Sequence, residues 1–189
     1  MGRYWLVQLV RAVIAFAAGF VITLDQAHAA DFGIAMFAAL AIVGGLAVCA
    51  FFWVTDAADR AIWLVQGLVG VAVGVVALIV RSQADGVAAL LYSVSVWALL
   101  TGAAELYGGW RARRLALDES ASRDRLLVGG ATVVLAIVYL VIPADHRLAV
   151  GLFGVYAIII GVYLAIGALS LKWARPAAEA SDETTESHA

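Results

Sequence analysis

Charge is scarce in this sequence: only 14% of residues are Asp, Glu, Lys or Arg, and the formal net charge is -2. We therefore expect no nucleic-acid partner, because proteins that bind nucleic acid present clustered positive charge. The single cysteine, Cys49, lies in an apolar stretch. One cysteine excludes an intrachain disulfide and a cysteine-rich metal site. The sequence has no phosphate-binding G-x-x-x-x-G-K loop, serine-nucleophile elbow or H-E-x-x-H pair, so we expect no enzyme and no cofactor.

Apolar residues dominate the chain instead. They make up 65% of the sequence, and the mean hydropathy is +0.98, well beyond the values of soluble domains. Six apolar runs are long enough to cross a bilayer, at residues 4–24, 32–54, 61–80, 87–110, 126–142 and 148–171. Lipid offers the backbone no hydrogen bonds, so the runs predict an all-α integral membrane protein whose six transmembrane helices lie within residues 1–173.

The first apolar run has a second interpretation. Residues 10–31 have a basic start, an apolar middle and the small-residue run Ala27-His28-Ala29, which together resemble a secretory signal with a cleavage site. A match between residues 9–22 and a later span, described below, favours retention. We therefore expect this segment to remain as the first transmembrane helix.

The last segment, residues 174–189, has a different composition. Four acidic residues stand among small polar residues after Pro176. Proline disfavours helix continuation, and this composition cannot bury enough apolar surface to offset the entropy of ordering. We expect Pro176 to end the sixth helix and the rest to form a disordered acidic cytoplasmic tail.

Basic residues predict the orientation in the membrane. If both termini are cytoplasmic, the inner side carries nine basic residues, namely Arg3, Arg60, Arg111, Arg113, Arg114, Arg123, Arg125, Lys172 and Arg175. The outer loops carry only Arg81 and Arg147. Tryptophans favour the same topology, because five of them fall near the predicted cytoplasmic helix ends: Trp5, Trp53, Trp63, Trp110 and Trp173. We therefore expect the chain to cross its membrane several times, with both ends on the inner side.

The apolar runs also repeat. The odd-numbered runs align as LVRAVIAFAAGFVI (9–22), LVQGLVGVAVGVVA (64–77) and, more weakly, LVGGATVVLAIVYL (127–140). The even-numbered runs align as LAIVGG (40–45), WALLTG (97–102) and YAIIIG (156–161), with Gly45, Gly102 and Gly161 in register. We therefore expect three parallel copies of a helical hairpin, at about 4–54, 61–110 and 126–171. In this alignment Arg11 matches Gln66 and Gly129, and Glu105 matches Val48 and Leu164.

The second hairpin carries WLVQGLVGVAVGVVALIV, a short polar turn and AALLYSVSVWALLTGAAELYGGWRARR. It resembles the repeat unit of the HdeD-like family of bacterial inner-membrane proteins, and GVYAIIIGVYLAIGAL in the third hairpin is similar. The resemblance covers about residues 4–173, and the first hairpin departs most, with Ala12 where the second has Gly67. It implies six membrane helices and an association with acid resistance, without an established biochemical activity for most relatives.

Arg11 and Glu105 are the two ionisable residues inside apolar runs. Charged side chains are costly in hydrocarbon and are therefore candidates for a function. Both are expected in the cytoplasmic half of the membrane, where they could form an intramembrane polar pair. One interpretation is structural, with the pair fixing helix register. The other is a proton relay or ion pathway.

Two further groups of residues are candidates. Small residues allow close helix packing or pore lining, and the seven predicted positions are Gly45, Gly67, Gly70, Gly74, Gly102, Gly154 and Gly161. Titratable residues of the outer loops would become more positive on acidification, and these are Asp25, His28, Asp31, Asp145 and His146. Ordinary solvated polarity and acid sensing both fit the second group, whose spacing does not suggest a metal site.

Two cytoplasmic segments are candidates for partner binding. Residues 111–125 carry five arginines and three acidic residues, which suit anionic lipid headgroups or a docking protein. The acidic tail is the second docking candidate, and the bilayer is the main expected partner. The leading functional hypothesis is a non-enzymatic membrane protein of the HdeD-like type that contributes to acid or envelope stress tolerance. The alternative is a small channel or transporter for protons or small solutes.

Overall fold

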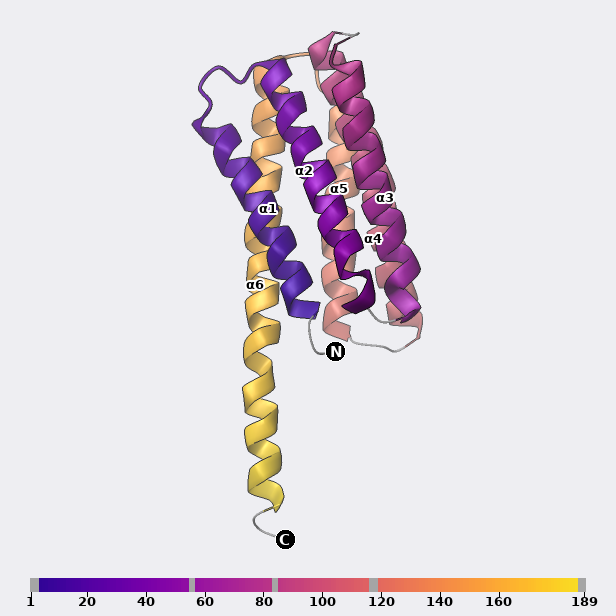
Figure 1. Ribbon diagram of the computed structural model, residues 1–189, viewed down its shortest axis with the longest axis vertical. Coiled ribbons are helices and arrows are strands. Elements are labelled where there is room, and N and C mark those ends of the chain that lie inside the picture. The colour runs from indigo at the N-terminus through magenta and orange to yellow at the C-terminus, as the bar shows by residue number, and fades with distance from the viewer. Residues whose placement is uncertain (1–3, 55–56, 83–84, 116–118, 187–189) are drawn as a thin grey trace.

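A computed structural model describes residues 4–54, 57–82, 85–115 and 119–186, and all of its regular elements are helical (Figure 1). The elements are α1 (Tyr4–Leu24), α2 (Ala30–Ala50), the short 3-10 helix η1 (Phe51–Val54), α3 (Ala57–Val80), α4 (Gly86–Arg114), α5 (Glu119–Val141) and α6 (His146–Glu186). Six of these helices are long and apolar enough to cross a membrane. The predicted all-helical chain with six such helices is confirmed.

The helices alternate in direction along one bundle. Figure 1 shows both chain ends at the lower end of the bundle, which we call the terminal end. The connections from α1 to α2, from α3 to α4 and from α5 to α6 lie at the opposite end, which we call the hairpin end. The two ends carry different charges, as described below.

Two helix boundaries differ from those expected. α4 continues to Arg114 and α5 begins at Glu119, so most of the predicted connection at 111–125 is helical. Arginine and glutamate are good helix formers, and the helix ends when Leu115 adopts a non-helical cap conformation. Of the basic residues counted above, Arg3 lies outside the described residues.

The sixth helix is longer than the sequence predicts. α6 passes through Pro176 and continues to Glu186, where a break and a disordered tail were expected over 174–189. Proline removes one backbone hydrogen bond, whereas Ala177, Ala178 and Glu179 directly after it are good helix formers, and the structure reflects the second preference. Residues 187–189 lie outside the described part.

The closest packing joins α2 to α3, α4 to α5, and α6 to α1. Each interface has a glycine whose α-carbon lies against the partner backbone. A methyl group on Gly45 would lie 2.6 Å from the Gly67 carbonyl oxygen, and one on Gly102 would lie 3.0 Å from that of Gly129. One on Gly161 would lie 3.1 Å from that of Ala12. Small residues here let the backbones touch, which increases van der Waals contact between helices in lipid.

An apolar core fills the half of the bundle nearer the hairpin end. Its fully buried members include Ile34, Phe37, Leu90, Val150 and Phe153. Phe37 packs edge-on against Phe153, with ring centroids 5.6 Å apart. This half of the interior is closed by side chains, and the polar residues of the interior lie mainly in the other half.

We predict that Gly45→Ala lowers the free energy of unfolding by about 1–3 kcal/mol, because the added methyl group meets backbone that cannot move away. Gly44→Ala is the matched control, since a methyl group there meets no atom within 4 Å. Unfolding of both variants in detergent micelles by a denaturing detergent measures the difference. Equal stability of the two variants would contradict the close contact.

Candidate functional site

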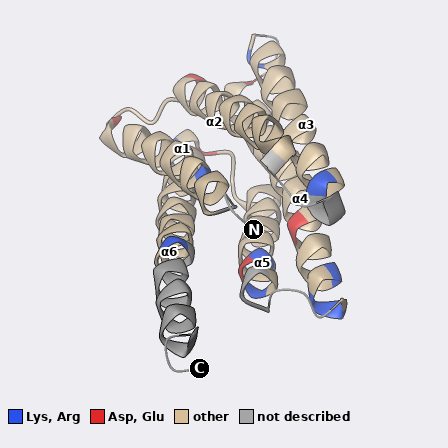
Figure 2. Cartoon of the chain, turned by 60° about the horizontal axis from the view of Figure 1, so that its bottom comes forward, with Lys and Arg blue, Asp and Glu red and all other residues tan. Residues whose placement is uncertain are grey.

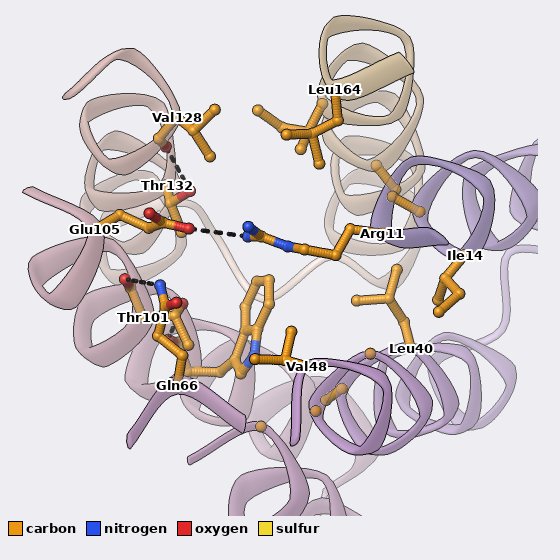
Figure 3. A pocket seen from close by; sticks show the side chains of 18 of the residues that line it. Arg11, Ile14, Leu40, Val48, Gln66, Thr101, Glu105, Val128, Thr132 and Leu164 are labelled. Atoms are coloured by element: carbon orange, nitrogen blue, oxygen red, sulfur yellow. Dashed lines mark hydrogen bonds and ion pairs between the residues drawn. The ribbon is translucent and has the colours of Figure 1, made fainter. Parts of the chain in front are cut away.

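Arg11 and Glu105 form an ion pair across the interior. Arg11 lies about two turns into α1, and its Nη2 donates a hydrogen bond of 3.0 Å to Oε1 of Glu105 on α4. Figure 3 shows the two side chains extended toward each other from different helices. The sequence left their pairing open, and the structure joins them.

The pair is largely removed from the surroundings. The exposed fraction of the side chain is 20% for Arg11 and 7% for Glu105. Each charge would be costly alone in a membrane interior, and the partner offsets much of that cost. The geometry therefore ties α1 to α4, which belong to different predicted hairpins.

The ion pair lines a cavity of about 100 Å³ at the centre of the bundle (Figure 3). All six long helices contribute to its wall, and the lining residues are Arg11, Ile14, Ala15, Leu40, Ala41, Gly44, Gly45, Val48, Gln66, Gly70, Trp97, Thr101, Glu105, Val128, Thr132, Tyr156, Ala157, Ile160 and Leu164. A cavity of this size holds several water molecules, because roughly 10–15 Å³ of such space accommodates one. Most of its wall is apolar, and its polar groups come from α1, α3, α4, α5 and α6.

Uncharged polar groups extend the site. Gln66 Nε2 of α3 donates to the Thr101 carbonyl oxygen of α4 over 3.4 Å. Thr132 donates its hydroxyl to the Val128 carbonyl oxygen, so the Tyr156 hydroxyl is the donor in the 2.8 Å bond between the two hydroxyls. The Tyr156 oxygen can then accept a hydrogen bond from a molecule in the cavity.

A second, smaller cavity continues toward the terminal end. Arg11 and Glu105 line it together with Gln8, Asp124, Arg125, Val128, Tyr163, Leu164 and Gly167. Tyr163 donates to Asp124 Oδ1 over 2.8 Å, which joins α6 to α5. The ion pair therefore stands between two cavities.

Trp63 of α3 brings two guanidinium groups close to this boundary. The guanidinium carbon of Arg11 lies 5.1 Å from the centroid of the Trp63 ring, and that of Arg125 lies 5.5 Å from it. Both distances fall in the range of cation–π attraction. Arg125 is itself buried, so positive charge is concentrated beside the ion pair.

Aromatic residues form the wall of the larger cavity toward the hairpin end. Trp97 and Tyr156 line it, with ring centroids 6.5 Å apart. Trp97 packs edge-on against Phe37 of the apolar core at 5.8 Å. The polar site thus ends where the packed core begins.

Sequence reasoning found the two charges and missed their neighbours. Gln66, Arg125 and Tyr156 lie in the site but were not candidates. Gln66 carried a signal, since it is a polar residue inside an apolar run that aligns with Arg11. Arg125 was assigned to a loop, and nothing in the sequence pairs the face of α6 that bears Tyr156 with that of α5.

All seven predicted packing glycines lie at close helix contacts. Besides the three interface glycines, a methyl group on Gly67, Gly70, Gly74 or Gly154 would lie within 2.9 Å of a neighbouring helix. Gly19 and Gly129 make contacts of the same kind and were not predicted. Gly45 and Gly70 also line the cavity, so packing and lining are not exclusive roles.

The predicted outer-loop residues all lie at the hairpin end, in separate local contacts. His28 has a positive φ of 46° and donates its backbone N–H to Asp25 Oδ2 over 2.9 Å. Asp31 forms an exposed ion pair with Arg81. Asp145 accepts the Leu148 N–H at the start of α6, and this hydrogen bond lowers the pKa of its carboxyl group. His146 begins α6 and is exposed.

Within the described part of the chain, no three or more His, Cys, Asp or Glu side chains gather into a possible metal site. The contacts of these residues are local: Asp25 and Asp145 each accept a hydrogen bond from a backbone N–H, and Asp31 forms an ion pair with Arg81. They form no common cluster.

The terminal end of the bundle is basic. Figure 2 shows basic residues at this end of α4, α5 and α6, and the last turn of α4 alone carries Arg111, Arg113 and Arg114. Cation–π contacts bring Arg114 to Trp110 and Lys172 to Trp5. Such basic and aromatic pairs suit the headgroup level of a membrane.

Comparison of this chain with known protein families, with curated proteins and with solved structures found no match.

We predict that Arg11→Met and Glu105→Met each lower the free energy of unfolding by about 3–5 kcal/mol, because each leaves one buried charge without its partner. The double variant should recover most of that loss. A double-mutant cycle, followed by unfolding in detergent micelles at low salt, measures the coupling.

Asp31→Asn is the control for this cycle, because it breaks an ion pair whose side chains are 65% and 38% exposed. Its effect should be much smaller, since exposed pairs are screened by solvent. Losses in the two Met variants that simply add in the double variant would contradict the pairing.

Proposed function

We propose that this chain is a multi-pass protein of the bacterial inner (plasma) membrane with both termini in the cytoplasm. Six apolar helices support the membrane part of the proposal. The concentration of arginine at the terminal end, against Arg81 and Arg147 at the hairpin end, supports the orientation. Residues 111–125 then lie at the cytoplasmic headgroups, where anionic lipid or a docking protein would meet them.

We also propose that the helices form three copies of one hairpin. The three interface glycines support this, because each approaches two equivalent atoms of its neighbour. Gly45 meets the Gly67 oxygen and the Val71 nitrogen, and Gly102 meets the Gly129 oxygen and the Val133 nitrogen. Gly161 meets the oxygen of Ala12 and the nitrogen of Phe16.

From these contacts we infer a different alignment for the third proposed copy. Gly129, rather than Gly130, corresponds to Gly67 and Ala12. The position of Arg11 is then matched by Gln66 and Val128, while that of Glu105 keeps Val48 and Leu164. All six residues line the larger cavity. The cavity therefore lies where the three proposed copies meet.

The function that this geometry supports best is uptake of protons or small solutes, without catalysis of a reaction. The observation that carries the proposal is the Arg11–Glu105 pair, because it lines two cavities at the centre of the bundle. A purely structural pair could be buried among tightly packed side chains. Here the pair borders space for several waters, so a water molecule or small solute has room beside Glu105.

Reconstitution into liposomes that contain a pH-sensitive dye tests this function. We predict a proton leak under an imposed pH gradient that falls to the level of empty vesicles in Glu105→Gln, which cannot carry a carboxyl proton. Asp145→Asn, a carboxylate change at the hairpin end, should leave the leak unchanged. Vesicles that remain silent with the wild-type protein would contradict proton uptake across the membrane.

A second candidate function is stress tolerance of the HdeD-like type, exerted through the bilayer or a partner protein. The resemblance of residues 4–173 to that family favours it, and so do the titratable side chains of Asp145 and His146 at the proposed outer face. We predict reduced survival of a deletion strain in acid. If the liposomes stay silent and the Glu105→Gln variant restores survival of the deletion strain, stress tolerance is favoured over proton uptake. Full survival of the deletion strain in acid would contradict the stress-tolerance function.

A further inference from the structure

The charges around the two cavities nearly cancel. Arg11 and Arg125 contribute positive charge, and Glu105 and Asp124 contribute negative charge. Asp124 already accepts a hydrogen bond from Tyr163, whereas Glu105 faces Arg11 and the larger cavity. Loss of the Glu105 charge by protonation would leave one positive charge in excess.

We propose that the Arg11 guanidinium is a binding site for a small monovalent inorganic anion, such as chloride, that is occupied when Glu105 is protonated. The proton and the anion then enter the cavity together, with no net charge. This inference rests on the proposed uptake function and names the substrate class of the same cavity.

The chemistry of the pair leads to this anion. Guanidinium groups do not lose their proton in proteins, so Arg11 keeps its charge when Glu105 becomes neutral. A buried charge without a counter-ion is strongly disfavoured. A small anion that takes the place of the carboxylate restores the balance, and the second N–H of the Gln66 amide can donate to it beside Arg11.

The other groups around Glu105 agree with a positive excess. From α1 it faces Arg11, from α3 the uncharged Gln66, and from α5 Arg125 and Asp124. From α6 it faces Tyr156 and Tyr163, which donate hydrogen bonds and remain neutral, and α2 presents apolar Val48. No described group beside Glu105 supplies a second free carboxylate in its place.

The size of the cavity restricts the anion. About 100 Å³ accommodates a monatomic anion with a few waters. The aromatic wall formed by Trp97 and Tyr156 excludes anything that extends toward the hairpin end. A large organic anion such as gluconate therefore serves as a non-binding replacement for chloride.

The test measures thermal stability of the full chain in detergent micelles, with chloride exchanged for gluconate at constant ionic strength. An anion that binds only the folded protein raises its melting temperature in a saturable way. Near neutral pH we expect Glu105→Gln to bind chloride about tenfold more tightly than the wild type, a difference of roughly 1.4 kcal/mol. The wild type should gain the same response on acidification, once Glu105 takes up a proton.

Three matched variants sharpen the result. Arg11→Gln combined with Glu105→Gln should lose the chloride response at every pH, and Asp145→Asn should behave as the wild type. The response of Glu105→Gln should not depend on pH. A chloride response that is equal in Glu105→Gln and wild type at neutral pH, or that survives loss of Arg11, would overturn the inference.

If Glu105→Gln does not fold, the wild-type protein still decides, because a chloride response that stays the same over the whole acidic range in which the protein remains folded overturns the proposal. Binding in micelles is also separable from uptake across a membrane. Chloride binding with silent liposomes supports the anion site and contradicts the uptake function. A proton leak that is unchanged when chloride is replaced by gluconate overturns the anion site and leaves the uptake function standing.

Discussion

Direct backbone contact at three glycines is the constraint on which the arrangement of this bundle depends. Lipid is as apolar as leucine, so burying apolar side chains between helices brings little of the stabilisation it brings in water. Van der Waals contact between closely packed helix backbones supplies the stabilisation instead, and Gly45, Gly102 and Gly161 allow the backbones to approach. These glycines pair α2 with α3, α4 with α5 and α6 with α1, and the cavity lined by all six long helices lies between the three pairs.

The pairing of the helices determines where the charges lie. Glu105 follows Gly102 by three residues, and Arg11 directly precedes Ala12, which Gly161 contacts. Residues at these positions lie beside the interface and face the centre. Both side chains are largely buried there, and each charge offsets much of the cost of burying the other. The ion pair is therefore a consequence of the packing register as much as of the two side chains.

The sequence predicted the six spans because hydropathy over about twenty residues is a strong local signal. Helix ends were less predictable: residues 111–114 and 119–125 are polar and also good helix formers, so polarity alone suggested a loop. The cavity was beyond prediction, since it depends on which helices pair. In the proposed repeat, the register of the third copy also differs by one residue from the sequence alignment, because Gly129 and Gly130 are indistinguishable in a pattern of small residues.

The residues that line the cavity are less alike among the proposed copies than the glycine contacts between the helices. At the position of Arg11 the other proposed copies carry Gln66 and Val128, and at that of Glu105 they carry Val48 and Leu164. A repeated charge would place like charges together at the centre, where their repulsion would be poorly screened. One cation and one anion from different copies avoid this and leave the remaining wall apolar. The chemistry of the cavity therefore belongs to residues in which the proposed copies differ, while the close helix contacts belong to residues that they share.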